Sequence, residues 1–318
     1  MTPPSLNDIY VARERIAPHV PPTPLMRHPL LDAESGLSIW VKHENHNPTC
    51  AFKVRGGLNL VGSLTPAERA RGLVTASTGN HGQSIALAAR LHAVACTVFV
   101  PEGNNPDKNA AMRAYGATVE EGGLDFDDAR ERCERRAADT GARYVHSANE
   151  PMLLAGVGTY ALELFEQLPD VDVVYVPIGG GSGACGLITV RNALGAKTRI
   201  VGIGAANADA VFRSWQGPER VTGAAANTFA EGVATRVTFD LTFGLLKQYL
   251  DDFIQLSEDE LAEGVRLALR TTHNLAEGAG SAAIAAAVKH KHQLTGQRVA
   301  CIMSGGNLDR AKLKWLLE

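Results

Sequence analysis

The sequence lacks the features that mark nucleic-acid-binding, membrane-spanning or secreted proteins. Its 318 residues include 31 Lys+Arg and 34 Asp+Glu, a formal net charge of −3, so it has no basic excess with which to neutralise phosphates. No apolar run approaches the roughly 18 residues that a membrane span needs. The opening MTPPSLNDIY lacks the basic segment and apolar core of a secretory signal. We therefore expect neither a nucleic-acid nor a membrane partner.

Cysteine is also scarce and scattered. The five cysteines lie too far apart for a zinc ribbon, a CxxC redox pair or a disulfide framework, and this spacing favours a reducing, cytoplasmic location. They are Cys50, Cys96, Cys133, Cys185 and Cys301.

Glycine, in contrast, is abundant, at 32 of 318 residues against roughly 7% in average proteins. Much of it is clustered between short apolar segments and helical patterns that alternate along the chain. Such alternation predicts an α/β fold with mostly parallel sheets covered by helices on both faces. The predicted strands are Leu37–Lys42, Gly72–Ala76, Ala95–Val100, Ala117–Glu120, Val173–Ile178, Arg199–Gly204 and Val299–Met303. One predicted helix begins at Thr65-Pro-Ala-Glu68. The other predicted helices span Gln83–Leu91, Asn109–Tyr115, Phe126–Asp139, Ser257–Thr272 and Gly280–Val288.

Ligands of parallel α/β sheets bind beyond the carboxyl ends of the strands, and one such end carries a glycine loop. Gly179-Gly-Gly-Ser-Gly183 follows a strand and opens a helix, which would form an anion cradle of backbone N–H groups. The run Gly181-x-Gly183-x-x-Gly186 also matches a dinucleotide fingerprint, but the next strand ends without the acidic residue that would hold a ribose. A phosphate monoester, a dinucleotide and a ligand-free turn all remain open from this motif alone.

A lysine occupies the second candidate motif, Asn47-Pro-Thr-Cys-Ala-Phe-Lys53. Asn-Pro breaks regular structure and Thr49 is positioned to cap a following helix, which puts Lys53 in the first turn. The helix dipole and partial burial would lower the pKa of Lys53 and make its amine a better nucleophile. Taken alone, the residue is better interpreted as a surface lysine.

Two further turns follow predicted strands. Ser77-Thr-Gly-Asn-His-Gly-Gln83 places small polar residues where a helix begins, which suits a carboxylate but also suits a simple helix cap. Ser304-Gly-Gly-Asn307 puts a hydroxyl at the end of the last strand, where it can bond a ring nitrogen. Together the four motifs describe a ligand with a phosphate, an aldehyde and a pyridine nitrogen, and an amino-acid substrate. That cofactor is pyridoxal 5'-phosphate.

These motifs, with Glu277-x-x-Gly280, resemble those of the fold-type II pyridoxal-phosphate enzymes, specifically the threonine/serine dehydratase and serine racemase group. The resemblance covers nearly the whole chain and implies a tryptophan synthase β-like fold with two open, twisted, mostly parallel sheets. It implies a large cofactor-binding domain (residues 1–68 and 148–318) and a small domain inserted in it (69–147) that closes over the substrate. It also implies a dimer or tetramer.

The resemblance assigns roles residue by residue. Lys53 would bind the cofactor covalently and then act as the general base at Cα, with Phe52 beside the ring and Asn80 on its hydroxyl. The phosphate would be held by Gly179, Gly180, Gly181, Ser182 and Gly183, the ring nitrogen by Ser304, and the substrate carboxylate by Ser77, Thr78, Gly79 and His81.

The implied reaction is elimination of the β-hydroxyl from L-threonine or L-serine, giving a 2-oxo acid and ammonia. A neutral serine at the ring nitrogen makes a weaker electron sink than an aspartate would, which favours prompt loss of a β-leaving group. Thr78 stands where racemases of the group carry a serine. The alternatives are a dehydratase for phenylserine or 3-hydroxyaspartate, an amino-acid racemase and, remotely, an NAD-dependent oxidoreductase.

The sequence departs from the group at two further places. Cys50 and Ala51 replace the usual Gly and Ser before Phe-Lys, and Gly204–Ala210 lacks the first and last carboxylates of the racemases' cation-binding run. Because a hard cation needs several oxygen ligands, we expect no metal there. The end of the chain at Glu318 leads us to expect no C-terminal regulatory domain.

Overall fold

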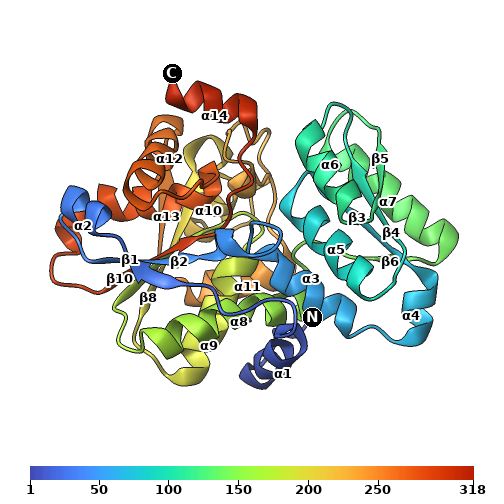
Figure 1. Cartoon of the computed structure of the whole chain (residues 1–318), viewed down its shortest axis with the longest axis horizontal. Coiled ribbons are helices and arrows are strands. Elements are labelled where there is room, and N and C mark those ends of the chain that lie inside the picture. Colours follow the sequence, from blue (N-terminus) through green and yellow to red (C-terminus); the bar gives the residue numbers. More distant parts are fainter.

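The computed structural model describes residues 1–318, which build two separate sheets flanked by helices (Figure 1). One sheet has six strands in the order β1-β2-β10-β7-β8-β9, parallel except for the β1–β2 pair. The other has four parallel strands in the order β5-β4-β3-β6. The strands are β1 Leu25–Arg27, β2 Ile39–His43, β3 Leu73–Ala76, β4 Cys96–Val100, β5 Thr118–Glu121, β6 Arg143–Tyr144, β7 Val173–Pro177, β8 Arg199–Ala205, β9 Asp252–Leu256 and β10 Val299–Met303.

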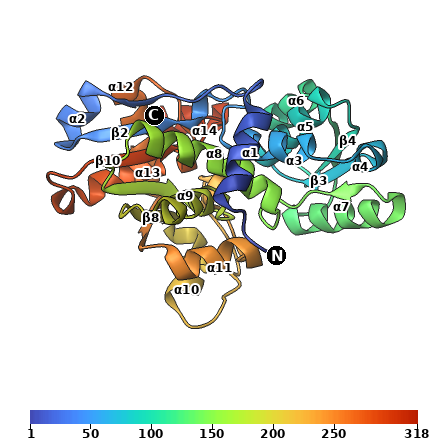
Figure 2. The same ribbon diagram turned by 90° about the horizontal axis from the view of Figure 1, so that it is seen from below.

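Fourteen α-helices and four short 3₁₀ turns connect and cover these strands. In Figure 1 the four-stranded sheet lies on the right with α4–α7, and most other helices surround the larger sheet. In Figure 1 α12 and α13 lie above the strands of the larger sheet and α9 lies below them, and the view from below has α8 and α9 in front of the strands (Figure 2). The helices are α1 Leu6–Ile16, α2 Pro29–Ser35, α3 Lys53–Gly62, α4 Pro66–Arg71, α5 Asn80–Leu91, α6 Pro106–Ala114, α7 Phe126–Thr140, α8 Pro151–Gln167, α9 Ser182–Leu194, α10 Ala210–Gln216, α11 Asp240–Tyr249, α12 Glu258–Thr272, α13 Gly278–Lys289 and α14 Arg310–Leu317; the 3₁₀ turns are η1 Glu44–His46, η2 Ala206–Ala208, η3 Glu231–Val233 and η4 Lys291–Gln293.

Alternate residues of the central strands point to opposite faces of the sheet and pack in two different hydrophobic cores. In β7, Val173 and Tyr175 pack in the cluster that contains α12 and α13 residues, whereas Val174 and Val176 pack against α8 and α9. Because both faces are covered, these strands are apolar throughout rather than alternating. The predicted α/β architecture with two mostly parallel sheets is therefore observed.

Every predicted strand and helix exists, with end shifts of a few residues. Helices α5 and α6 begin earlier than predicted, at Asn80 and Pro106, and in α6 the side chain of Asn105 caps the helix. The expectation that Thr49 caps the lysine helix is wrong. The helix α3 begins at Lys53 with Phe52 at the N-cap and no side-chain cap bond, and the Thr49 hydroxyl is buried without a hydrogen-bond partner.

The sequence patterns do not predict the longest helix, α8. Its residues 153–165 are all buried, since it packs against α1, α3 and α9. A helix buried all round carries no amphipathic stripe, so periodicity gives no signal for it.

The cap of α12 supports a specific stability prediction. The Ser257 hydroxyl accepts a bond from the Glu260 N–H at 3.2 Å, and the Glu260 carboxylate accepts one from the Ser257 N–H at 2.8 Å. We expect Ser257→Ala to lower the free energy of unfolding by about 1 kcal/mol, measured from the denaturant midpoint. Ser257→Asp keeps an acceptor and should retain most of the stability; an equal loss in both variants would contradict the capping role.

Strands between residues 73 and 144 form the four-stranded sheet, and strands at 25–43 and 173–303 form the larger one. The domain boundaries at 68/69 and 147/148 stay a prediction. None of the helices combines the length and apolarity required to cross a bilayer.

Candidate active site

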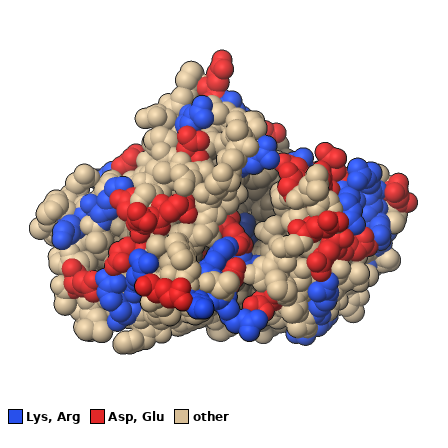
Figure 3. Space-filling view, turned by 90° about the horizontal axis from the view of Figure 1, so that it is seen from above, with Lys and Arg blue, Asp and Glu red and all other residues tan.

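A cleft of about 1570 Å³ is lined by residues from loops and helices that adjoin both sheets. Three strands direct their carboxyl ends to it: β3 is followed by Ser77, β7 by Gly179 and β10 by Ser304, all of which line the cleft. Figure 3 shows the hollow between the two parts of the molecule, with charged side chains of both signs around it. The predicted site residues thus meet in one place, although they are spread along the chain from Phe52 to Ser304.

Lys53 lies inside this cleft at the start of α3. Its Nζ donates to the Ser182 hydroxyl at 3.0 Å and to the Ser147 carbonyl at 3.4 Å, and it makes no ion pair with a carboxylate. Burial lowers the pKa of Lys53 to about 8 from its ordinary value of 10.5. A buried amine without a counter-charge is easily deprotonated and becomes nucleophilic.

The glycine loop runs from β7 into α9 beside Lys53. Gly181 is the N-cap of α9 with φ of +87°, a conformation that strongly favours glycine. The backbone N–H groups of residues 179–184 make no hydrogen bond within the chain. Six successive free donors at a helix N-terminus form an anion site.

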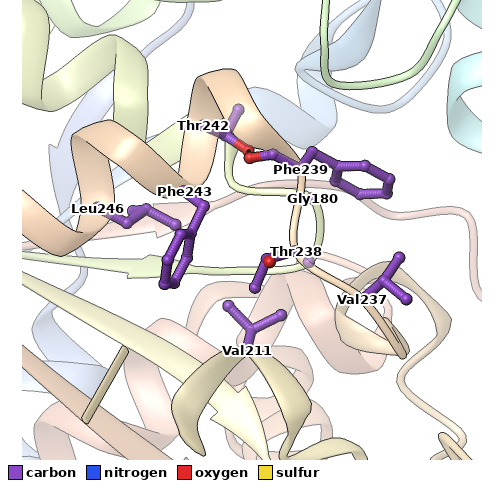
Figure 4. A pocket seen from close by; sticks show the side chains of 9 residues that line it. Gly180, Val211, Val237, Thr238, Phe239, Thr242, Phe243 and Leu246 are labelled. Atoms are coloured by element: carbon purple, nitrogen blue, oxygen red, sulfur yellow. Dashed lines mark hydrogen bonds between the residues drawn. The ribbon is translucent and has the colours of Figure 1, made fainter. Parts of the chain in front are cut away.

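Packing behind the loop fixes its position. The apolar cluster in Figure 4 comprises side chains of α10, α11 and the segment between them around Gly180. A Cβ on Gly180 would lie 3.3 Å from Phe239, and one on Gly179 would lie 2.2 Å from the Gly232 carbonyl oxygen. The loop therefore has no room for side chains on this side, and its N–H groups are held in place.

The turn after β3 is organised by its serine. The Ser77 hydroxyl accepts bonds from the N–H groups of Gly79 at 3.2 Å and Gly82 at 2.8 Å, so its own hydrogen is available to a ligand. Thr78 and Gly79 also line the cleft. His81 is buried; burial first, and then the Lys53 charge, lowers its pKa to about 3, so it is neutral at neutral pH.

The amide of Asn80 is held from both sides. Its Nδ2 donates to Glu277 Oε1 at 2.7 Å, and its Oδ1 accepts from Asn307 Nδ2 at 2.7 Å. These bonds fix the amide orientation and leave one Nδ2 hydrogen for a ligand. Ser304 lies 5% exposed, and its hydroxyl makes no hydrogen bond within the chain.

Charged side chains connect the two walls of the cleft. Lys108 of α6 pairs with Glu231 of η3, which also pairs with Lys312 of α14. Asp107 of α6 pairs with Arg310 at 2.9 Å. The sequence does not predict these pairs, because ion pairs between residues 81 or more positions apart leave no spacing pattern.

The residues present fit a pyridoxal phosphate. The six free N–H groups suit its phosphate, the unpaired buried amine of Lys53 suits its aldehyde, and the unpartnered Ser304 hydroxyl suits a ring nitrogen. Phe52 also lines the cleft, with its ring centroid 5.3 Å from the Lys53 amine. The roles of the individual residues stay predictions.

Comparison with known proteins identifies the family. The family model for the pyridoxal-phosphate dependent enzymes matches residues 16–305. An L-threonine ammonia-lyase of Thermotoga maritima is 37% identical over 96% of this chain and 76% of its own length. A beta-hydroxyaspartate dehydratase of Paracoccus denitrificans is 32% identical over 98% of this chain and 99% of its own.

Solved structures lead to the same family. The crystal structure of T.th. threonine deaminase superposes with a TM-score of 0.91 at 35% identity, over 96% of this chain and 99% of that one. Maize serine racemase gives 0.93 at 28% identity, over 99% and 97%. The chain therefore belongs to the pyridoxal-phosphate dependent enzymes. The predictions of fold-type II architecture, of the threonine dehydratase and serine racemase group and of this cofactor are confirmed.

The pKa of Lys53 predicts how the cofactor-free protein captures its cofactor. Only the neutral amine attacks an aldehyde, so the rate of capture should rise about tenfold per pH unit below pH 8 and then level off. The growth of visible absorbance after mixing with pyridoxal phosphate measures this rate. A rate that continues to rise to pH 10 would show that the amine titrates as an ordinary lysine.

Proposed function

We propose that this protein is an ammonia-lyase that eliminates water from a β-hydroxy amino acid, L-threonine or L-serine, and yields a 2-oxo acid and ammonia. The observation that carries the proposal is the buried Lys53 amine, without a carboxylate partner, beside six free N–H groups. The ammonia-lyase and dehydratase relatives support the same chemistry.

Held by Lys53 and residues 179–183, the cofactor would supply an aldehyde for the substrate amine and an electron sink for the charge released at Cα. The residues of the chain supply the rest. The Lys53 amine, once free, is the general base that takes the Cα proton. The Ser77 hydroxyl and the turn through Gly79 bind the substrate carboxylate, and residues 179–183 bind the phosphate.

The neutral hydroxyl of Ser304 bears on the course of the reaction. It does not keep a ring nitrogen protonated as a carboxylate does, so a negative charge at Cα is stabilised less. Under that condition loss of the β-hydroxyl competes well with slower outcomes such as transamination. The enamine that leaves the site tautomerises and takes up water, and this releases ammonia.

We further propose that residues 69–147 are a domain that closes over the substrate. The pairs Lys108–Glu231 and Asp107–Arg310 would then form on closure and exclude water from the cleft. All five cysteines are unpaired, which supports a reducing cytoplasm. We also propose that the protein forms a homo-oligomer, either a dimer or a tetramer.

A release assay for 2-oxo acids across the stereoisomers of serine, threonine, phenylserine and 3-hydroxyaspartate tests the reaction. We expect the highest kcat/KM for L-threonine or L-serine. A preference for 3-hydroxyaspartate or phenylserine would change the substrate within the same chemistry. Racemised amino acid without 2-oxo acid, measured by chiral chromatography, would contradict the lyase proposal.

A further inference from the structure

His146 is a cleft residue to which the sequence motifs assign no role. It follows β6 in the turn that leads to α8, and it lines the cleft. Its Nδ1 accepts two backbone hydrogen bonds, from the N–H groups of Ala148 and Asn149, both at 3.0 Å. A neutral imidazole whose Nδ1 is an acceptor must carry its hydrogen on Nε2. The turn thus fixes the tautomer of His146.

The Nε2–H of His146 is an uncommitted donor. It has no hydrogen-bond partner within the chain and is not fully buried, and His146 is one of the residues that line the cleft. The ring is held edge-to-face by Phe239, at 4.9 Å between centroids, and by Tyr144, at 6.1 Å. The donor therefore has a fixed direction as well as a fixed tautomer.

The surroundings of His146 place it where the reaction occurs. The next residue, Ser147, accepts a bond from the Lys53 amine through its carbonyl. Phe239 and Ala148, which contact the ring and its turn, each lie 3.3 Å from the position of a Cβ on Gly180 in the phosphate loop. The neighbours of His146 thus contact both the Lys53 amine and the phosphate loop.

The protonation state of the ring is also set by its surroundings. Burial first, and then the charges of Arg130 and Lys53, lower the pKa of His146 to about 4. The ring is consequently neutral in the working range, and its Nε2–H can give a hydrogen bond without giving up the proton.

We propose that the Nε2–H of His146 donates a hydrogen bond to the oxygen on the substrate's Cβ, and so selects substrates whose β-substituent is a hydroxyl group. This inference rests on the proposed elimination reaction. As the Cβ–O bond breaks, negative charge develops on that oxygen, and a fixed donor stabilises it more than it stabilises the bound substrate. His146 would then be a specificity-determining residue that contacts the substrate.

Two substitutions separate this role from a purely structural one. His146→Asn keeps an acceptor at the position of Nδ1, so the turn at Ala148 and Asn149 is preserved, but its side chain is too short to donate from the Nε2 position. His146→Gln keeps an amide donor near the Nε2 position and loses the acceptor in the turn. A structural role predicts that the Gln variant is impaired, whereas the proposal predicts that the Asn variant is.

The holoenzymes should be compared on L-serine and on β-chloroalanine, which shares the carboxylate and the Cα proton but loses chloride. We expect His146→Asn to lower kcat/KM for serine by about 10²-fold, the usual effect of removing one donor to a developing oxyanion, and to change it less than about threefold for β-chloroalanine. His146→Gln should recover much of the serine activity.

Thermal midpoints and the visible absorbance of the bound cofactor provide readouts apart from turnover, and both should be unchanged in His146→Asn. Equal losses on the two substrates, or a Gln variant worse than the Asn variant on serine, would overturn the role of His146. If the wild-type enzyme released oxo acid from neither substrate, the proposed elimination itself would fail, which is a different result.

Discussion

Lys53→Ala is expected to abolish both the visible absorbance of the bound cofactor and the release of 2-oxo acid. The amine at this position is buried, lacks a counter-charge and lies beside the phosphate loop. The other lysines of the cleft, Lys108 and Lys312, are both paired with Glu231, so neither can replace it as nucleophile and base. General base catalysis alone contributes about 10²–10⁴ in rate, and the covalent link adds to that. Absorbance spectra and the oxo-acid assay on the purified variant measure the effect.

Two matched variants make this result interpretable. Lys53→Arg keeps the positive charge but stays protonated, so it should be equally inactive. Lys197→Ala removes an exposed lysine and should keep full absorbance and activity. Substantial turnover in Lys53→Ala would contradict the assigned chemistry.

The largest expected effect on stability is at Arg55, two residues after Lys53 on the same helix. Its guanidinium is fully buried and bonds Glu44 at 2.7 Å and Glu163 at 2.6 Å. Glu163 in turn accepts from Lys42 at 2.6 Å. The network therefore joins β2, η1, α3 and α8 through two cations and two anions.

Arg55→Met should lower the free energy of unfolding by roughly 3–5 kcal/mol, because it leaves a buried carboxylate without its partner. The denaturant midpoint of the holoenzyme measures this. The control, Arg13→Met, breaks the exposed Arg13–Glu166 pair, which should cost less than about 1 kcal/mol. Similar losses in the two variants would contradict the importance of the buried network.

Much of the candidate site could be predicted because its residues come in short continuous motifs. A glycine loop after a strand, a serine turn and a lysine after Asn-Pro each reflect local backbone requirements, such as the positive φ of Gly181. Because such requirements concern consecutive residues, the motifs can be recognised in a single sequence. The alternation of apolar strands and helices predicted the parallel sheets for the same reason.

The remaining parts of the site depend on residues that meet only after folding. The hydrogen bonds of Asn80 with Glu277 and Asn307, and the Lys108–Glu231 pair, join segments that are far apart in the sequence. The free Nε2–H of His146 depends on the geometry of a single turn. The helix α8 is likewise invisible to periodicity, because burial on all sides removes the polar face that marks a helix.

The sequence by itself determined the cofactor and the class of fold. Four short motifs taken together predict the cofactor, because each reflects backbone and side-chain chemistry within consecutive residues, and the alternation of strands and helices along the chain predicts the fold. Which donors remain free in the cleft is set by the folded chain alone. A hydrogen bond is available to a ligand only when no neighbour has taken it, and the neighbours of His146 and Ser304 are brought there by chain folding rather than by sequence proximity.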